Sequence, residues 1–259
     1  MLLQNKNAVI YGGSGAIGGA VARAFAREGA KVFLAGRTLA KLDAVARELR
    51  AAGAMAETAQ VDALDAHSLK EQIADVARKA GAIDVSFNAI SWEDIQGTAL
   101  IEMSLEDFSH PISIATRTQF LTAKAVAPHM IKKGSGVIMT ITATPSRLGF
   151  PLCGGFSVAC AAVEGFSRSL AAELGPQGVR VICLRSAGSP ETIPDTMDVH
   201  AAGTRMTREA FIASLKEMSL LKRLPSLADV GNVAALMASD YAGTMTGTVA
   251  NMTCGQIVD

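Results

Sequence analysis

Two hydrophobic periods alternate along the chain, and their alternation predicts the fold. Short apolar runs predict buried strands, at Ala8–Tyr11, Lys31–Ala35, Ile83–Asn88, Val137–Thr142, Val179–Leu184 and Thr248–Met252. Longer stretches with helical spacing predict helices, at Ala20–Glu28, Leu39–Ala52, Leu69–Ala80, Phe120–Lys132 and Ala161–Leu174. Strands that alternate with helices form a parallel sheet covered by helices on both faces. We therefore predict a doubly wound α/β fold.

Glycines stand at or near the ends of these predicted helices, at Gly29, Gly53, Gly81, Gly134 and Gly175. Helices often end on a residue with left-handed backbone, which glycine adopts without steric cost. We therefore predict left-handed backbone at these positions.

No Pro/Ser-rich linker and no repeat divides the chain, so we expect a single domain over residues 1–259. Residues 186–207 break the alternation with a segment rich in Gly, Pro, Ser and Thr, directly after a predicted strand. Ligands of open α/β sheets bind outside the carboxyl ends of the strands. This segment is therefore a candidate substrate loop or lid, and the alternative is a plain surface connection.

Composition excludes several classes of partner. The 24 Lys and Arg residues balance 24 Asp and Glu residues, and aromatic residues make up 5% of the chain. This predicts no nucleic-acid partner, because such proteins carry basic patches and stacking aromatics. Four cysteines without C-x-x-C spacing indicate a reducing, cytoplasmic location. We also expect no membrane span, no signal peptide and no metal site.

A glycine-rich turn, GGSGAIGG, follows the first predicted strand and opens a helix. Such a turn brings backbone close to a dinucleotide pyrophosphate, and the helix start holds the anion. We expect dinucleotide contacts from small or backbone-exposing positions of the turn, at Gly12, Ser14, Gly15, Ile17 and Gly18.

The end of the second predicted strand indicates which dinucleotide binds. NAD sites place Asp or Glu there to accept hydrogen bonds from the ribose. No acidic residue lies between Glu28 and Asp43, and the strand ends at Arg37. A guanidinium suits the extra phosphate of NADP. We therefore expect NADP(H) as the cofactor; the alternative is that Arg37 is a solvated charge at a helix start.

Several motifs together resemble the short-chain dehydrogenase/reductase family along nearly the whole chain. They are the turn after Tyr11, Val61-Asp62, FNAIS at 87–91, AAVEGFSRSLAAELGPQG at 161–178, and the tail at 245–255. The resemblance implies a single-domain Rossmann fold with cofactor contacts at Asp62, Asn88 and Thr192. Asp62 would meet the adenine amino group and Thr192 the nicotinamide amide. It also implies a homo-oligomer, a dimer or tetramer.

The same resemblance removes the family's usual chemistry. The positions of the catalytic Asn, Ser, Tyr and Lys are occupied here by Ala115, Ala143, Phe156 and Cys160. A Tyr–Lys pair with wider spacing, as in the family's enoyl reductases, is also excluded. The only tyrosines are Tyr11 and Tyr241, and no Lys occurs between residues 133 and 216.

These replacements leave an apolar pocket beside the nicotinamide, suited to an apolar small-molecule substrate. We favour a noncanonical NADPH-dependent oxidoreductase acting on an activated carbonyl or conjugated substrate, because the cofactor carries the redox chemistry. Thr144 is the candidate hydroxyl to orient a carbonyl, although a strand-end Thr is often bonded by backbone. One alternative is an NADP-binding pseudoenzyme, a sensor or supporting subunit. Another is cofactor-independent isomerisation or dehydration by Glu93, Asp94 or His110.

Two further positions lie near predicted strand ends. Trp92 follows the fourth strand and is expected to line the entrance of the site. Arg185 follows the sixth, and we expect it to be solvated or paired with a carboxylate rather than to bind an anionic substrate.

Overall fold

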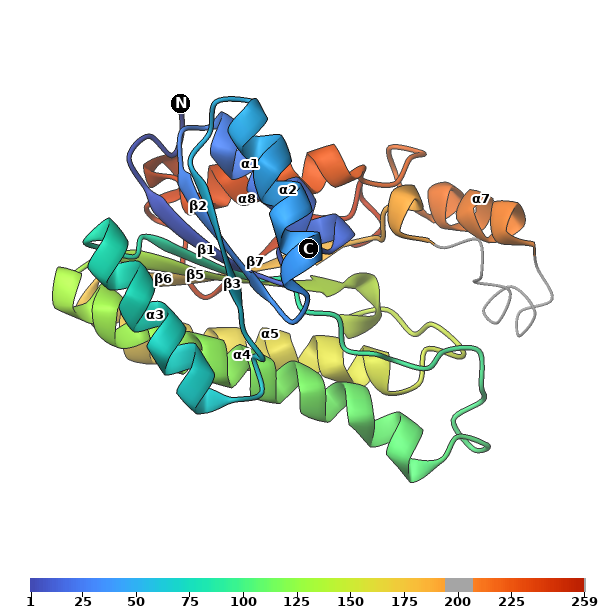
Figure 1. The fold of residues 1–259 in the computed structure, drawn as a ribbon. Helices are drawn as coiled ribbons and strands as arrows, with labels where there is room; N and C mark the ends of the chain where they lie inside the picture. Colours follow the sequence, from blue (N-terminus) through green and yellow to red (C-terminus); the bar gives the residue numbers. More distant parts are fainter. Residues whose placement is uncertain (194–206, 259) are drawn as a thin grey trace.

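The computed structural model describes residues 1–193 and 207–258 and contains a seven-stranded parallel sheet, in the order β3-β2-β1-β4-β5-β6-β7 (Figure 1). The strands are β1 (Asn7–Tyr11), β2 (Lys31–Gly36), β3 (Ala56–Gln60), β4 (Val85–Asn88), β5 (Gly136–Ala143), β6 (Val179–Ser186) and β7 (Thr248–Met252). The predicted doubly wound α/β fold is confirmed.

Helices cover both faces of the sheet (Figure 1). On one face lie α1 (Ala16–Arg27), α2 (Leu39–Ala51) and α8 (Leu227–Ala238). On the other lie α3 (Ala66–Ala80), α4 (Leu105–Lys133) and α5 (Gly155–Leu174). The remaining described helices are α7 (Arg208–Met218) and the short 3₁₀ turns η1 (Thr144–Ser146), η2 (Gly175–Gln177), η3 (Pro190–Thr192) and η4 (Asp240–Ala242).

The alternation of side chains along each strand divides the core into two layers. In β1, Ala8 and Ile10 join the apolar cluster under α1, α2 and α8. Val9 and Tyr11 join the cluster under α3, α4 and α5. All four side chains are 1% exposed or less. Each buried Val or Ile stabilises the fold by roughly 1.5–3 kcal/mol, so the two-sided burial fixes the central strands that carry the site.

The structure corrects several element predictions. Strand β3 was missed because its sequence, AETAQ, has no apolar run and three of its residues are half-exposed. Helix α4 begins at Leu105, well before the predicted start at Phe120, and includes Pro111. Helices α7 and α8 were not predicted. The observed strand β6 extends two residues beyond its predicted end.

The predicted left-handed glycines are confirmed at Gly29, Gly53, Gly81 and Gly134, with φ between 74° and 90°. The prediction at Gly175 is wrong, because its φ is −55° and the chain continues into η2. The left-handed residue is Gly178, at φ 78°. There a Cβ would lie 2.1 Å from the Gly134 carbonyl oxygen, so the site requires glycine on both counts.

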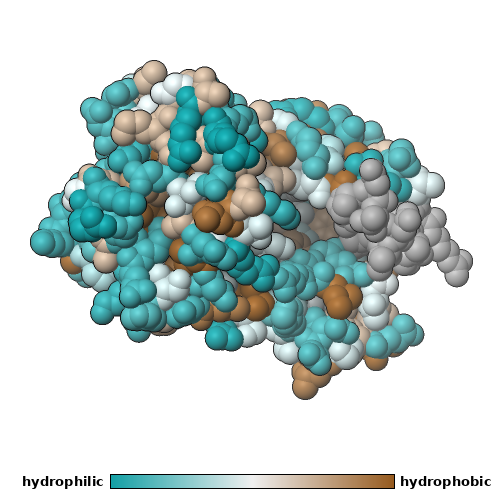
Figure 2. Space-filling view, viewed as in Figure 1, coloured by the Kyte–Doolittle hydropathy of each residue, from teal (hydrophilic) through white to brown (hydrophobic). Residues whose placement is uncertain are grey.

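The candidate substrate loop at 186–207 is described only at its ends, and residues 194–206 lie outside the described residues. Among the helices of the described part of the chain, none combines the length and apolarity needed to cross a lipid bilayer. The face shown in Figure 2 is largely hydrophilic, with apolar residues in separate patches.

Candidate functional site

The candidate site lies at the carboxyl ends of β1, β2 and β4. The chain order reverses on either side of β1, and open α/β sheets bind ligands in the crevice at such a switch point. A cleft of ≈ 560 Å³ opens here. Five of the predicted cofactor residues line it, namely Gly12, Ser14, Gly15, Arg37 and Asp62.

The glycine-rich turn is held by close backbone contacts. Gly12 has a φ of 71°, and a Cβ on it would lie 2.5 Å from the Ala89 carbonyl oxygen. A Cβ on Gly18 would lie 2.2 Å from the carbonyl oxygen of Gly12. Gly15 is the N-cap of α1 and contributes no capping side chain. The first N–H groups of the helix are thus left to an anion in the cleft.

Four predicted cofactor residues do not line the cleft. Ile17 and Gly18 belong to the first turn of α1, and Gly18 packs closely against the backbone of Gly12 in the glycine-rich turn. Asn88 is buried; its Nδ2 donates to Thr122 Oγ1 at 3.0 Å, and its Oδ1 accepts from the backbone N–H of Ile90. Asn88 therefore braces the loop after β4. Thr192 lies in η3, where its hydroxyl donates to the Ser189 carbonyl oxygen at 2.8 Å.

Three ionisable side chains lie together in the lining of the cleft. Arg37 Nη2 lies 2.8 Å from Glu93 Oε1, and His110 Nε2 lies 3.5 Å from Glu93 Oε2. A hydrogen bond from Arg37, with its charge, lowers the pKa of Glu93 below its ordinary value. Glu93 also has a φ of 55°, which is uncommon for a residue with a side chain. Its backbone and its carboxylate are thus both constrained.

The four positions where the resemblance puts the catalytic tetrad come together in space. Ala115, Ala143, Phe156 and Cys160 belong to one apolar cluster, and Trp92 belongs to it as well. The Trp92 and Phe156 rings lie 5.5 Å apart at an angle of 44°. Trp92 is 6% exposed, and Ala115 and Cys160 are fully buried. An aromatic pair therefore lies where the apolar pocket was expected.

The described part of this cluster offers no acid–base group of the usual kind. Burial raises the pKa of the Cys160 thiol well above its ordinary value, so the thiol is neutral at physiological pH. Tyr11 is buried, with its hydroxyl 3.4 Å from Gln72 Oε1 on α3. Tyr241 is 85% exposed on η4. Neither tyrosine belongs to the cluster around Phe156.

The hydroxyls at the end of β5 are buried. Thr142 donates to Glu164 Oε1 at 3.1 Å, so its hydroxyl is engaged in the protein interior rather than directed at a ligand. Thr144, the candidate orienting residue, begins η1 and is 4% exposed. Its carbonyl oxygen accepts from the backbone N–H groups of Arg147 and Leu148, which explains how the neighbouring Pro145 is accommodated in a tight turn.

A buried ion pair between β6 and α5 lies next to this region. The sequence analysis did not include it in the site. Arg185 on β6 donates from Nε and Nη2 to the two carboxylate oxygens of Glu164 on α5, at 2.9 and 2.8 Å. The side chains are 2% and 4% exposed. The prediction that Arg185 pairs with a carboxylate is confirmed. Glu164 was missed, although a buried strand arginine requires an anionic partner somewhere.

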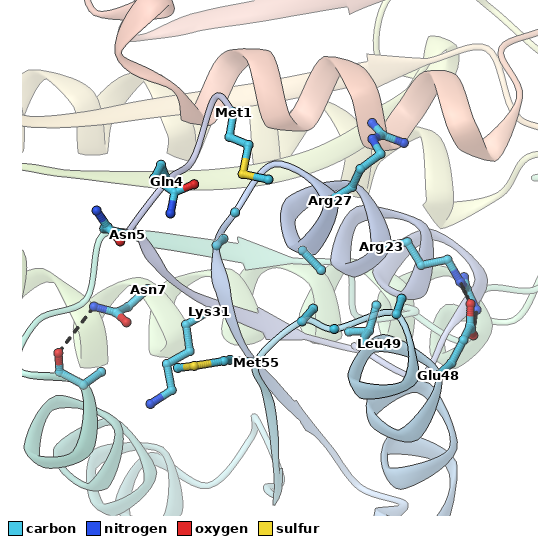
Figure 3. Close-up of a pocket in the computed structure, with 17 residues that line it drawn as sticks. Met1, Gln4, Asn5, Asn7, Arg23, Arg27, Lys31, Glu48, Leu49 and Met55 are labelled. Atoms are coloured by element: carbon cyan, nitrogen blue, oxygen red, sulfur yellow. Dashed lines mark hydrogen bonds and ion pairs between the residues drawn. The ribbon is translucent and has the colours of Figure 1, made fainter.

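A larger hollow, of ≈ 970 Å³, lies at the opposite end of the strands. Figure 3 shows Met1 and Gln4 of the N-terminal segment on one side and Arg23 and Glu48, joined as an ion pair, on the other. This edge holds the amino ends of the strands, where open α/β sheets do not bind their ligands. We therefore assign the site to the smaller cleft. Within the described residues, no three His, Cys, Asp or Glu side chains are grouped to hold a metal ion.

Comparison with known proteins identifies the family. Residues 13–256 match a family model described as enoyl-(acyl carrier protein) reductase. The chain belongs to the short-chain dehydrogenase/reductase family. Members of this family are oxidoreductases that use a nicotinamide cofactor, NAD or NADP, and act on small-molecule substrates.

Relatives in the short-chain dehydrogenase/reductase family cover nearly the whole chain. Oxidoreductase UcpA of Salmonella typhimurium is 30% identical over 249 residues, 95% of this chain and 92% of the relative. The probable galactose dehydrogenase GalD of Rhizobium meliloti is 28% identical over 248 residues, 94% and 92% of the two chains. The crystal structure of gox2181 has a TM-score of 0.86 at 24% identity, covering 98% of this chain and 96% of its own.

Proposed function

We propose that this protein is an NADP(H)-dependent oxidoreductase that reduces an activated carbonyl or conjugated substrate without a Tyr–Lys acid. One observation carries the proposal: the nucleotide cleft keeps its glycine turn and a cationic side chain, while the neighbouring reaction site is apolar.

The residues of the cleft fit a phosphorylated dinucleotide. The first backbone N–H groups of α1 would hold the pyrophosphate, and the absence of side chains at Gly12 and Gly15 would let it approach them closely. Arg37 would bind the 2′-phosphate, and Asp62 would meet the adenine amino group. The carboxylate of Asp62 is already fixed, because its Oδ1 accepts from the Leu64 backbone N–H at 2.9 Å.

The nicotinamide, when bound, supplies hydride to the substrate. The chain's contribution at that end is to align an apolar substrate, through the cluster around Phe156 and Trp92. Cys160 retains its proton. The proton that completes the reduction therefore comes from solvent. Loss of a positioned acid typically slows a reaction by about 10²–10⁴-fold, which restricts turnover to substrates that are already activated.

A pseudoenzyme that binds NADP is the second candidate, and the burial of Trp92 favours it, because its ring is covered at the expected reaction site. Cofactor-independent acid–base chemistry is less well supported. Its candidate Glu93 is held in an ion pair to Arg37, and the lowered pKa makes its carboxylate a weaker base.

One experiment separates these candidates. Purified protein is mixed with NADPH and a panel of quinones, enones and diketones, and both NADPH and product are followed. Consumption of NADPH supports the oxidoreductase. Saturable binding without consumption supports the pseudoenzyme. Product formed without NADPH supports cofactor-independent chemistry.

The same proposal includes a homo-oligomer, a dimer or tetramer, formed through α4 and α5. Phe120 on α4 is 51% exposed and Val158 on α5 is 43% exposed, which leaves apolar surface for a second copy. The mass in solution at micromolar concentration tests this; a monomer contradicts it.

A further inference from the structure

We propose that Trp92 is a catalytic residue of this site, and that its indole N–H donates a hydrogen bond to the oxygen of a flat, aromatic or conjugated carbonyl substrate. This inference rests on the proposed function and gives it a substrate class. It assigns to Trp92 the part that a hydroxyl plays in relatives with a complete tetrad.

The first observation is an unsatisfied donor. Trp92 Nε1 is buried and has no hydrogen-bond acceptor among the described residues. Buried polar groups in native structures nearly always have partners, and leaving one unpaired costs about 1–3 kcal/mol. A phenylalanine at this position would avoid that cost. The donor has no internal acceptor among the described residues and is covered in this structure, so an acceptor on a ligand would reach it when the neighbouring side chains move apart.

The second observation is the location of that donor. Trp92 lies in the same cluster as Phe156, Cys160, Ala143 and Ala115, the positions that hold the polar tetrad in family members. None of these four side chains carries an O–H or N–H group. Indole nitrogen is a donor only, so Trp92 is suited to bind an oxygen on which negative charge develops.

The third observation is that residues of the nucleotide cleft hold the segment that carries Trp92. The next residue, Glu93, has left-handed backbone and is held by Arg37 and His110. Strained backbone of this kind persists where surrounding contacts enforce it, and it clusters at functional sites. A ligand that engages Arg37 thereby acts on the loop that positions the indole.

The shape of the cluster defines the substrate class. The rings of Trp92 and Phe156 are tilted by 44° at 5.5 Å, and the surrounding side chains are apolar. An aromatic or conjugated ring would pack against these rings offset-stacked or edge-to-face. During reduction the carbonyl carbon gains hydride, the oxygen gains negative charge, and solvent supplies the proton. Trp92 keeps its own proton throughout.

The test uses the fact that Trp92 is the only tryptophan in the chain. The isotope-labelled protein then gives a single indole N–H signal in a proton–nitrogen correlation spectrum. The probe is the aromatic diketone acenaphthenequinone, added to protein saturated with NADP⁺. The matched control is acenaphthene, which has the same carbon skeleton without oxygen. We expect the diketone to shift the indole signal downfield and the hydrocarbon to leave its hydrogen-bonding state unchanged.

Two variants complete the test. Trp92→Phe is expected to lower kcat/KM for the diketone by roughly ten- to hundredfold, the loss of one hydrogen bond to a developing charge, with the Kd for NADPH unchanged. Tyr241→Phe, a change at an aromatic side chain that is 85% exposed on η4, is the control and is expected to retain both the activity and the diketone-induced indole shift.

An indole signal that does not move while the diketone is reduced, together with full activity of Trp92→Phe, overturns the role of Trp92 and leaves the proposed function intact. Failure of the NADP⁺-loaded protein to bind the diketone overturns the substrate class. Failure to bind either form of the cofactor removes the proposed function itself, and the role of Trp92 with it.

Discussion

Arg37 Nη2 lies 2.8 Å from Glu93 Oε1, across the cleft, although 56 residues separate the two in the chain. The guanidinium comes from the end of β2 and the carboxylate from the loop after β4, so the pair spans the strand that carries the glycine-rich turn. The two side chains are 72% and 48% exposed. Ion pairs this exposed contribute little to folding, and a phosphate dianion can therefore replace Glu93 on Arg37.

Removing the charge of Arg37 and removing the charge of Glu93 should shift the affinity for NADPH in opposite directions. Arg37→Ala should weaken NADPH binding by roughly ten- to hundredfold, since hydrogen bonds to charged groups contribute about 1.5–3 kcal/mol. Glu93→Gln should tighten NADPH binding, because it removes the anion that competes for Arg37. The Kd values for NADPH and NADH are measured by calorimetry. Glu102→Gln, an exposed carboxylate of the same loop region, is the matched control. Equal Kd values for NADPH in the wild type and Arg37→Ala would remove Arg37 from the site.

The glycine-rich turn gives a prediction with a control in the same helix. Gly18→Ala should abolish cofactor binding and destabilise the protein, because its Cβ would lie 2.2 Å from the Gly12 carbonyl oxygen. Gly19→Ala should be tolerated or slightly stabilising. Its Cβ meets the flexible Arg23 guanidinium at 3.2 Å, and helical Gly→Ala gains roughly 0.5–1 kcal/mol. Thermal unfolding and NADPH titration measure both. Similar unfolding temperatures and similar NADPH affinities in the two variants would contradict the close contact between Gly18 and Gly12.

The buried Glu164–Arg185 pair should dominate stability near the site. Glu164→Gln removes the carboxylate that accepts two hydrogen bonds from the buried Arg185 guanidinium and should cost about 3–5 kcal/mol of the free energy of unfolding. Glu173→Gln, an exposed carboxylate on the same helix, should change it by less than about 0.5 kcal/mol. Denaturant titration followed by circular dichroism measures both. A loss below about 1 kcal/mol in Glu164→Gln would contradict the buried pair.

The same pair gives the protein a defined pH dependence. Burial acts to raise the pKa of Glu164, but hydrogen bonds from Arg185, Ser146 and Thr142 outweigh it, and the pKa is lowered below the ordinary 4.5. A carboxyl whose pKa is lower in the folded state stabilises the protein above its unfolded pKa and loses that contribution as the pH falls through its folded pKa. The wild type should therefore lose stability below about pH 4.5, and Glu164→Gln should lose less over that interval. Parallel curves for the two proteins would contradict this.

Restoring the usual catalytic groups should change the reaction. The triple variant Ala143→Ser, Phe156→Tyr, Cys160→Lys should create or raise reduction of simple ketones, since a positioned acid contributes about 10²–10⁴-fold. It should also be less stable, because Cys160 is fully buried and the larger Lys must displace its neighbours. NADPH consumption with a ketone panel measures the first effect and thermal unfolding the second. A variant that binds NADPH normally and reduces no ketone would show that the site differs beyond these positions.

The parts of the fold that follow from local pattern were predictable. Strands β6 and β7 are rich in apolar and β-branched residues, and they were found with their starts correct. Elements that depend on tertiary contacts were not. The first half of α4 contains Pro111, which disfavours a helix interior, yet Pro111 is buried there. A Cβ on Gly155 of α5 would meet the Phe108 carbonyl oxygen at 1.9 Å, so close helix packing accommodates this segment.

The candidate site shows the same division. The turn residues and Arg37 follow from spacing within one strand–helix unit, and the structure puts Gly12, Ser14, Gly15 and Arg37 in one cleft. The partners Glu93 and Glu164 could not be predicted, because each pairing joins elements that become neighbours only when the sheet is assembled. The unpaired nitrogen of Trp92 is equally invisible in a sequence, since it depends on what surrounds the indole.

The central claim is that the cleft binds a phosphorylated nicotinamide dinucleotide although the reaction site beside it is apolar. Isothermal titration of the purified protein with NADPH and NADH tests this most directly. The account predicts saturable binding at one site per chain, with NADPH bound more tightly than NADH and the preference lost in Arg37→Ala. The absence of heat with both dinucleotides, from a protein shown to be folded, would contradict it.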